Sequence, residues 1–263
     1  MRFLYPFGKE KALTMSYDDG NMPDLRLVSL FNKYNVKATF NLNSMRSLSE
    51  HTPYELRSIY KGHEIACHGL EHKWPTRLSP TALYREVACD KAALEEVFHT
   101  PVRGMAYAFG DYNAEVIRTV KGLGIHYART CEETQDFGLP EDFIRWTPSC
   151  HHNNNLSSLA DRFLDFPGWY ELPLFYVWGH SYEFDGDGGI GWNEMEEFLQ
   201  KVSGRENIYY ATNIEIYDYI TAVRSAEFWD KGRRLYNPSA WDIYIENNAG
   251  KKVKLGSRKS VII

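Results

Sequence analysis

The stretch Ser16-Tyr17-Asp18-Asp19-Gly20 ends an apolar run, residues 11–17, that is typical of a buried strand. Neighbouring side chains on an extended backbone point to opposite faces, so one carboxylate can bind a metal while the other faces a water. His68 follows fifty residues after Asp18, and His72 stands four residues beyond it, so both imidazoles can converge on one ion. One carboxylate and two imidazoles leave a coordination position open, as hydrolysis requires. These residues predict a metal-dependent hydrolase.

The overall composition excludes two classes of partner. The chain has 263 residues, a formal net charge of -5 and a pI near 6.0, which argues against nucleic acid binding. No apolar run approaches the roughly 20 residues that a membrane-spanning helix needs. Residues 1–8 lack the apolar core of a signal peptide, and the four cysteines form no CxxC pair. We therefore expect a cytoplasmic protein with reduced thiols, or a secreted one if a leader segment was removed.

Strand-like and helical segments alternate along most of the chain. A helix is expected over residues 80–98, because Ser79 is a good N-cap and Pro80 suits the first helical position. Repeated βα units predict a mainly parallel sheet or barrel, with catalytic side chains at the carboxyl ends of strands. Asp18, His68 and His180 all fall at such ends. The expected strands span residues 11–17, 36–42, 63–68, 102–108, 125–130, 143–147, 169–178 and 208–211.

The last fifty residues follow a different pattern. Residues 214–226 have helical spacing, and two short strand-like segments then flank Asn-Asn-Ala-Gly at residues 247–250, which is a hairpin turn signal. We expect a main domain over residues 1–222 and a C-terminal helix and hairpin extension, residues 223–263, packed on it.

The Asp-Asp-Gly stretch, the His-x-x-x-His stretch and the spacing between them resemble those of the polysaccharide deacetylase family, the NodB-homology carbohydrate esterases. Residues 35–40 are similar to the family's second-strand signature, and residues 62–68 to the segment that precedes its metal-binding histidines. The resemblance covers residues 11–220. It implies an α/β fold, a distorted (β/α) barrel of about seven units rather than the full eight.

The resemblance also implies roles for individual residues. Asp19, His68 and His72 match the family's metal ligands, and Asp18 matches its general base. The bound ion is expected to be Zn²⁺, with Co²⁺, Ni²⁺ or Mn²⁺ as alternatives. His180 resembles the late histidine that protonates the leaving group. Metal and base would activate a water, and a backbone N–H would help to stabilise the oxyanion.

The chain departs from the family pattern at two motifs. If Phe109-Gly110 is the aromatic-Gly pair of the third motif, Ala106 stands where the family has an arginine that orients the base. Arg103 either replaces that arginine or is only a surface charge, and the Phe109 N–H becomes the oxyanion donor. The family's acidic-tryptophan segment is replaced by residues 129–133, Arg-Thr-Cys-Glu-Glu. A divergent member with a different substrate is therefore expected.

Several further side chains are candidates for substrate contacts. His151 precedes a second histidine in a loop that is expected at the barrel mouth, where it would contact substrate, bind metal or be only a polar loop residue. Glu183 is placed to orient His180. Aromatic rings suit sugar stacking or core packing, and the ring candidates are Trp74, Tyr107, Trp169, Trp178 and Tyr182.

Three functions are compatible with these residues. The first is removal of acetyl groups from an N- or O-acetylated carbohydrate. The second is a non-catalytic relative that only binds carbohydrate, which the two altered motifs favour. The third is hydrolysis of a small non-peptide amide.

Overall fold

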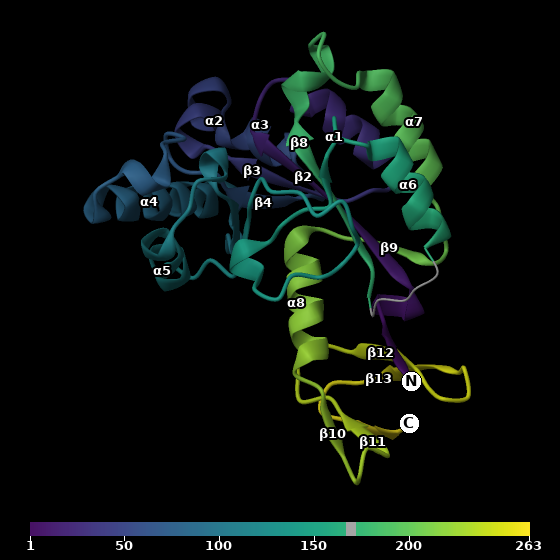
Figure 1. The fold of residues 1–263 in the computed structure, drawn as a ribbon. Helices are drawn as coiled ribbons and strands as arrows, with labels where there is room; N and C mark the ends of the chain where they lie inside the picture. Colours follow the sequence, from purple (N-terminus) through teal and green to yellow (C-terminus); the bar gives the residue numbers. More distant parts are fainter. Residues whose placement is uncertain (167–171) are drawn as a thin grey trace.

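A curled parallel sheet forms the centre of the molecule (Figure 1). The computed structural model describes residues 1–166 and 172–263. Neighbouring strands of the sheet follow the order β6-β5-β4-β3-β2-β8-β7, and β9 pairs with the start of β2. The strands are β2 (Lys11–Asp19), β3 (Ala38–Leu42), β4 (Glu64–Cys67), β5 (Gly104–Ala106), β6 (Tyr127–Arg129), β7 (Cys150–His151), β8 (Leu174–His180) and β9 (Ile208–Tyr210).

All the pairings in this sheet are parallel. No ladder within the described residues joins the edge strands β6 and β7, so the barrel stays open. The predicted distorted (β/α) barrel is thus confirmed. One predicted strand is wrong: residues 143–147 begin with a 3-10 turn, because the Asp142 side chain accepts a hydrogen bond from the Ile144 N–H. The predicted strand 169–178 and the ring of Trp169 fall partly or wholly outside the described residues.

Helices cover the outside of the sheet (Figure 1). The predicted helix over residues 80–98 is confirmed, and the Ser79 side chain accepts a hydrogen bond from Ala82 N–H as its cap. The helices are α1 (Asp24–Lys33), α2 (Ser44–Glu50), α3 (Pro53–Ile59), α4 (Pro80–Phe98), α5 (Ala114–Gly122), α6 (Leu156–Asp165), α7 (Trp192–Val202) and α8 (Asn213–Arg224). Short 3-10 turns span Pro6–Gly8, Pro75–Arg77, Ala108–Gly110, Phe143–Arg145 and Ser181–Asp185. None of the described helices has the length and apolar character to cross a membrane.

Two small antiparallel sheets lie at the far end of α8 (Figure 1). The predicted hairpin is confirmed as β12 paired with β13, but the N-terminal strand β1 adds to it, with Arg2 opposite Glu246. A buried apolar cluster that includes Tyr5, Tyr219 and Ile245 joins these sheets to the barrel. The strands are β1 (Arg2–Leu4), β10 (Glu227–Trp229), β11 (Arg234–Tyr236), β12 (Ile243–Glu246), β13 (Lys252–Leu255) and β14 (Ser260–Ile262). The division into domains at residue 222 stays a prediction.

Candidate active site

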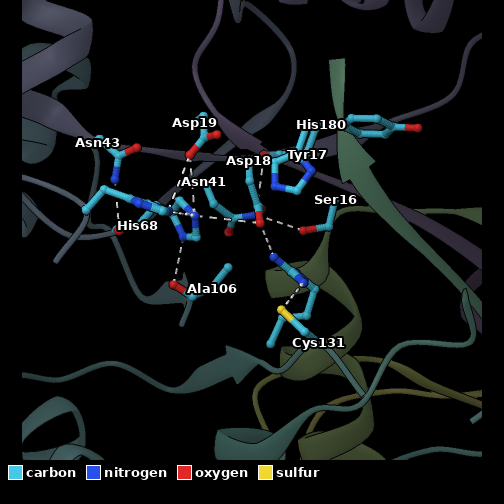
Figure 2. A network of polar contacts seen from close by, with 12 residues as sticks. Ser16, Tyr17, Asp18, Asp19, Asn41, Asn43, His68, Ala106, Cys131 and His180 are labelled. Carbon is cyan, nitrogen blue, oxygen red and sulfur yellow. Dashed lines mark hydrogen bonds and ion pairs between the residues drawn. The ribbon is translucent and has the colours of Figure 1, made fainter. Parts of the chain in front are cut away.

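The Asp-Asp pair and the first histidine meet at the carboxyl ends of two strands. Asp18 and Asp19 end β2, and His68 follows β4 directly, with β3 between the two strands. Asn41 on β3 donates hydrogen bonds to Ser16 Oγ and Asp18 Oδ1, both at 2.8 Å. Figure 2 shows both carboxylates turned toward His68. The parallel sheet thus places the predicted residues side by side, as its repeated units lead one to expect.

Asp19, His68 and His72 have the spacing of metal ligands. Asp19 Oδ1 lies 3.6 Å from His68 Nε2 and 3.6 Å from His72 Nε2, and the two imidazole nitrogens are 3.2 Å apart. Tetrahedral zinc with bonds of about 2.0–2.1 Å holds its ligand atoms about 3.3 Å from one another. Burial, followed by the charge of His68, lowers the pKa of His72, which favours the neutral ring that binds metal. The donor set therefore fits a divalent cation.

The orientation of His68 is fixed by backbone groups and by helix α4. Its Nδ1 donates a hydrogen bond to the carbonyl oxygen of Ala106 at 2.9 Å, which leaves Nε2 for the metal. Asp90 on α4 accepts hydrogen bonds from the backbone N–H groups of Ser44, His68 and Gly69. The buried carboxylate of Asp90 thus holds the loop that carries the histidines, although it binds no metal itself.

We expect Asp90→Asn to weaken both folding and metal binding. An amide has one acceptor oxygen, whereas Asp90 uses both oxygens to accept three N–H groups, so the change leaves buried donors unpaired and costs about 1–3 kcal/mol. Thermal unfolding and zinc titration measure the two effects. Glu96→Gln, an exposed position on the same helix, is the matched control. Unchanged zinc affinity in a less stable Asp90→Asn protein would show that Asp90 supports only the fold.

Arg129 pairs with the predicted base, a contact that the sequence did not reveal. Its Nη2 donates to Asp18 Oδ2, and both side chains are almost fully buried, at 0% and 2% exposure. The guanidinium lies over the Trp178 ring, 4.1 Å from the centroid, and Nη1 donates to the Thr130 carbonyl. Burial alone would raise the pKa of Asp18, but Arg129 and then His68 outweigh burial and lower it. Asp18 is therefore ionised and held in one orientation.

The alternative that Arg103 reaches into the site is wrong. Its guanidinium forms a two-pronged ion pair with Asp218 on α8, at 2.9 and 2.7 Å. It lines a pocket with Lys37 and His63, which precede β3 and β4, so it lies at the amino ends of the strands and away from the site. Arg129 on β6, the strand next to β5, contacts the base instead. No motif spacing pointed to it; only its place at a predicted strand end could have done so.

The residues after β5 divide between the site and the core. Phe109 has a positive φ of 59° and a ring that is 47% exposed, 4.4 Å from the His72 ring. Gly110 also has a positive φ, of 65°, and a Cβ there would lie 2.9 Å from Cys131 Sγ, so glycine is required. Tyr107 is fully buried and donates to the Ile144 carbonyl. Its predicted substrate contact is wrong, because the ring points into the core.

His180 lies at the end of β8, opposite Asp18 in the register of the sheet. Its Nδ1 is 3.2 Å from Glu183 Oε2, so the ring proton sits on Nδ1 and the other nitrogen is free of this contact. Burial would lower the pKa of His180, but the hydrogen bond to Glu183 and the charge of Asp18 raise it. The His151 ring lies 6.0 Å from the His180 ring, and its Nε2 is 3.1 Å from the same Glu183 oxygen.

Two comparisons of this sequence with known proteins both find deacetylases. Residues 7–128 match the family model described as polysaccharide deacetylase. A chitin deacetylase from a Pestalotiopsis species is 26% identical over 136 residues, which cover 51% of this chain and 46% of that protein. The chain thus spans about half the length of this curated relative.

Solved structures show the same fold. One from Mycobacterium smegmatis, assigned to the polysaccharide deacetylases, superposes with a TM-score of 0.65 at 18% identity, over 85% of this chain and 94% of that chain. Puue allantoinase superposes with a TM-score of 0.63 at 13% identity, over 81% of this chain and 91% of that chain. The sequence match over residues 7–128 and the superposed structures show that this chain is similar to the polysaccharide deacetylases and shares their fold.

Proposed function

We propose that this chain is a metal-dependent hydrolase that removes acetyl groups from an N- or O-acetylated carbohydrate. The observation that carries the proposal is the convergence of Asp19, His68 and His72 at 3.2–3.6 Å beside the buried, ionised Asp18. A divalent metal held by these three side chains would activate a water and polarise the acyl carbonyl. The family and the chitin deacetylase relative support the acetyl chemistry.

Asp18 and His180 supply the proton transfers in this proposal. Asp18 accepts a proton from the attacking water, because Arg129 keeps the carboxylate charged and the Asn41 amide holds its other oxygen. His180 donates a proton to the leaving nitrogen or oxygen, since its raised pKa favours the protonated ring near neutral pH. The two groups come from adjacent strands, so they can act from different directions on one substrate.

Exposed aromatic rings beside the histidines support a sugar substrate. Phe109 stacks on Trp74 with centroids 4.1 Å apart and an interplanar angle of 3°, and the pair adjoins His72. Tyr182 is 46% exposed, and its ring lies 5.2 Å from that of His180. Flat apolar rings next to polar groups are suited to the faces of pyranose rings.

Acetate release tests the proposed function. Purified protein is stripped of metal, reloaded with zinc or cobalt, and incubated with N-acetylglucosamine oligomers and with acetylated xylan. We expect release that requires the metal, and the better substrate identifies N- or O-acetyl preference. Glycan binding in calorimetry without release from any substrate would instead indicate a carbohydrate-binding protein. Hydrolysis of small amides alone would show that the same chemistry acts on small amides instead of carbohydrates.

A further inference from the structure

A second group of histidines surrounds Glu183, outside the three ligands described above. Four nitrogen atoms lie close to the one oxygen Oε2: His151 Nε2 and His152 Nε2 at 3.1 Å, and the Nδ1 and backbone N of His180 at 3.2 and 3.1 Å. The side chains are 0–25% exposed. Three imidazoles and a carboxylate thus converge on one point, and they come from β7 and the residue after it, from β8 and from the turn that follows β8.

Hydrogen bonds from His180 account for part of this arrangement but leave Glu183 Oε2 crowded. A carboxylate oxygen has about two lone-pair positions, fewer than the four nitrogens that crowd Oε2. His152 Nε2 is buried and has no hydrogen-bond partner in the described residues, although it lies 3.1 Å from that oxygen. The contact therefore has the distance of a hydrogen bond without its direction. The distances from Glu183 Oε2 to His151 Nε2 and to His180 Nδ1, 3.1 and 3.2 Å, are close to the roughly 3.3 Å between ligand atoms of tetrahedral zinc.

We propose that His151, His180 and Glu183 form a second site for a divalent transition-metal cation. One ligand atom from each of the three lies within 4.8 Å of the others. Two imidazole nitrogens and one carboxylate oxygen suit zinc, cobalt or nickel better than magnesium or calcium, which prefer oxygen ligands. His152 packs against the same carboxylate and completes the surroundings of the site.

The second site is weaker than the first. The Asn153 N–H lies 3.2 Å from His151 Nδ1, so this nitrogen accepts a hydrogen bond when the metal is absent. A cation at Nε2 places the ring proton on Nδ1, and the contact with Asn153 must then break. The loss of one hydrogen bond lowers the affinity on the order of tenfold. The first site has no such conflict, because His68 Nδ1 already donates to Ala106.

A cation in the second site inhibits catalysis, a consequence that rests on the proposed function. A cation at His180 Nδ1 replaces the proton there and leaves the Nε2 proton bound throughout the neutral range. His180 then cannot exchange a proton with substrate. Excess zinc should therefore inhibit an enzyme that one equivalent of zinc activates.

Zinc stoichiometry tests the site without reference to activity. Equilibrium dialysis followed by elemental analysis is expected to give two zinc ions per chain for the wild type, the second bound about tenfold more weakly. Glu183→Gln and His151→Gln should each bind one, and Asp19→Asn should keep one at the second site. Asp187→Asn, an exposed carboxylate in the same loop, is the matched control and should bind two. Thermal unfolding verifies that each variant is folded.

The outcomes separate the site from the proposed function. One zinc per chain in the wild type, or two in both folded Glu183→Gln and His151→Gln, overturns the site. Two ions without acetate release would overturn the proposed function and leave the site standing. Inhibition through the second site is tested by the ratio of activity at ten equivalents of zinc to activity at one equivalent. A ratio well below one in the wild type and close to one in His151→Gln supports this inhibition. Equal ratios in the two proteins overturn it.

Discussion

Asp18→Asn is expected to keep its metal and to lose turnover by about 10²–10⁴-fold, the usual contribution of a general base. Asparagine has the shape of aspartate but cannot accept a proton, while the three ligands remain in place. The change also leaves the buried charge of Arg129 without its partner, so thermal unfolding must accompany the assay. Acetate release and bound zinc are measured on the same sample.

Asp19→Asn provides the contrasting variant. It should lose both the metal at the first site and the activity, because asparagine lacks the charge that balances the cation. Both variants are expected to be inactive, so zinc content, rather than activity, distinguishes the roles of Asp18 and Asp19. If Asp18→Asn retained more than about a tenth of wild-type turnover, the base would have to be another residue.

The second large effect is expected from Arg129→Met, which should destabilise the fold by about 3–5 kcal/mol. The substitution leaves the Asp18 carboxylate charged and buried without its counter-ion. The stabilisation from this pair is present above the ordinary pKa of aspartate, about 3.9, and is lost as the pH falls through the lowered pKa of the folded state. Urea unfolding of the metal-free protein at neutral pH measures the loss.

Two further variants test whether the loss of stability comes from the unpaired buried charge. Arg103→Met removes the other strongly paired arginine, but this pair is 34% and 16% exposed, so the expected cost is about 0–1 kcal/mol. The double variant Asp18→Asn with Arg129→Met removes both buried charges and should be more stable than Arg129→Met alone. If the double variant were equally unstable, the packing of Arg129 on Trp178 would matter more than its charge.

The sequence predicts those parts of the molecule that depend on local rules. The helix Pro80–Phe98 has its predicted bounds because Ser79 and Pro80 determine where it begins. Asp18, Asp19 and His68 lie together because parallel strands align their carboxyl ends. The hairpin of β12 and β13 follows from its turn residues.

The contacts that the sequence misses are made between strands. The family pattern led to Ala106 and Arg103 on β5 or just before it, whereas Arg129 on the next strand reaches Asp18. A motif describes positions along one segment, and a side chain from a neighbouring strand can occupy the same space. Tyr107 shows the same limit, because the sequence does not tell which face of a short strand points into the core.

The pairing of β1 with β12 determines when the small sheet can form during synthesis. Arg2 lies opposite Glu246, and 244 residues separate them along the chain. The barrel strands can pair as they emerge from the ribosome, but β1 has no partner until β12, which lies more than 240 residues further along, has been made. Until then, the edge of β1 is free to pair with strands of other chains. A chaperone that shields β1 during synthesis should therefore raise the yield of folded protein more than one that acts after release.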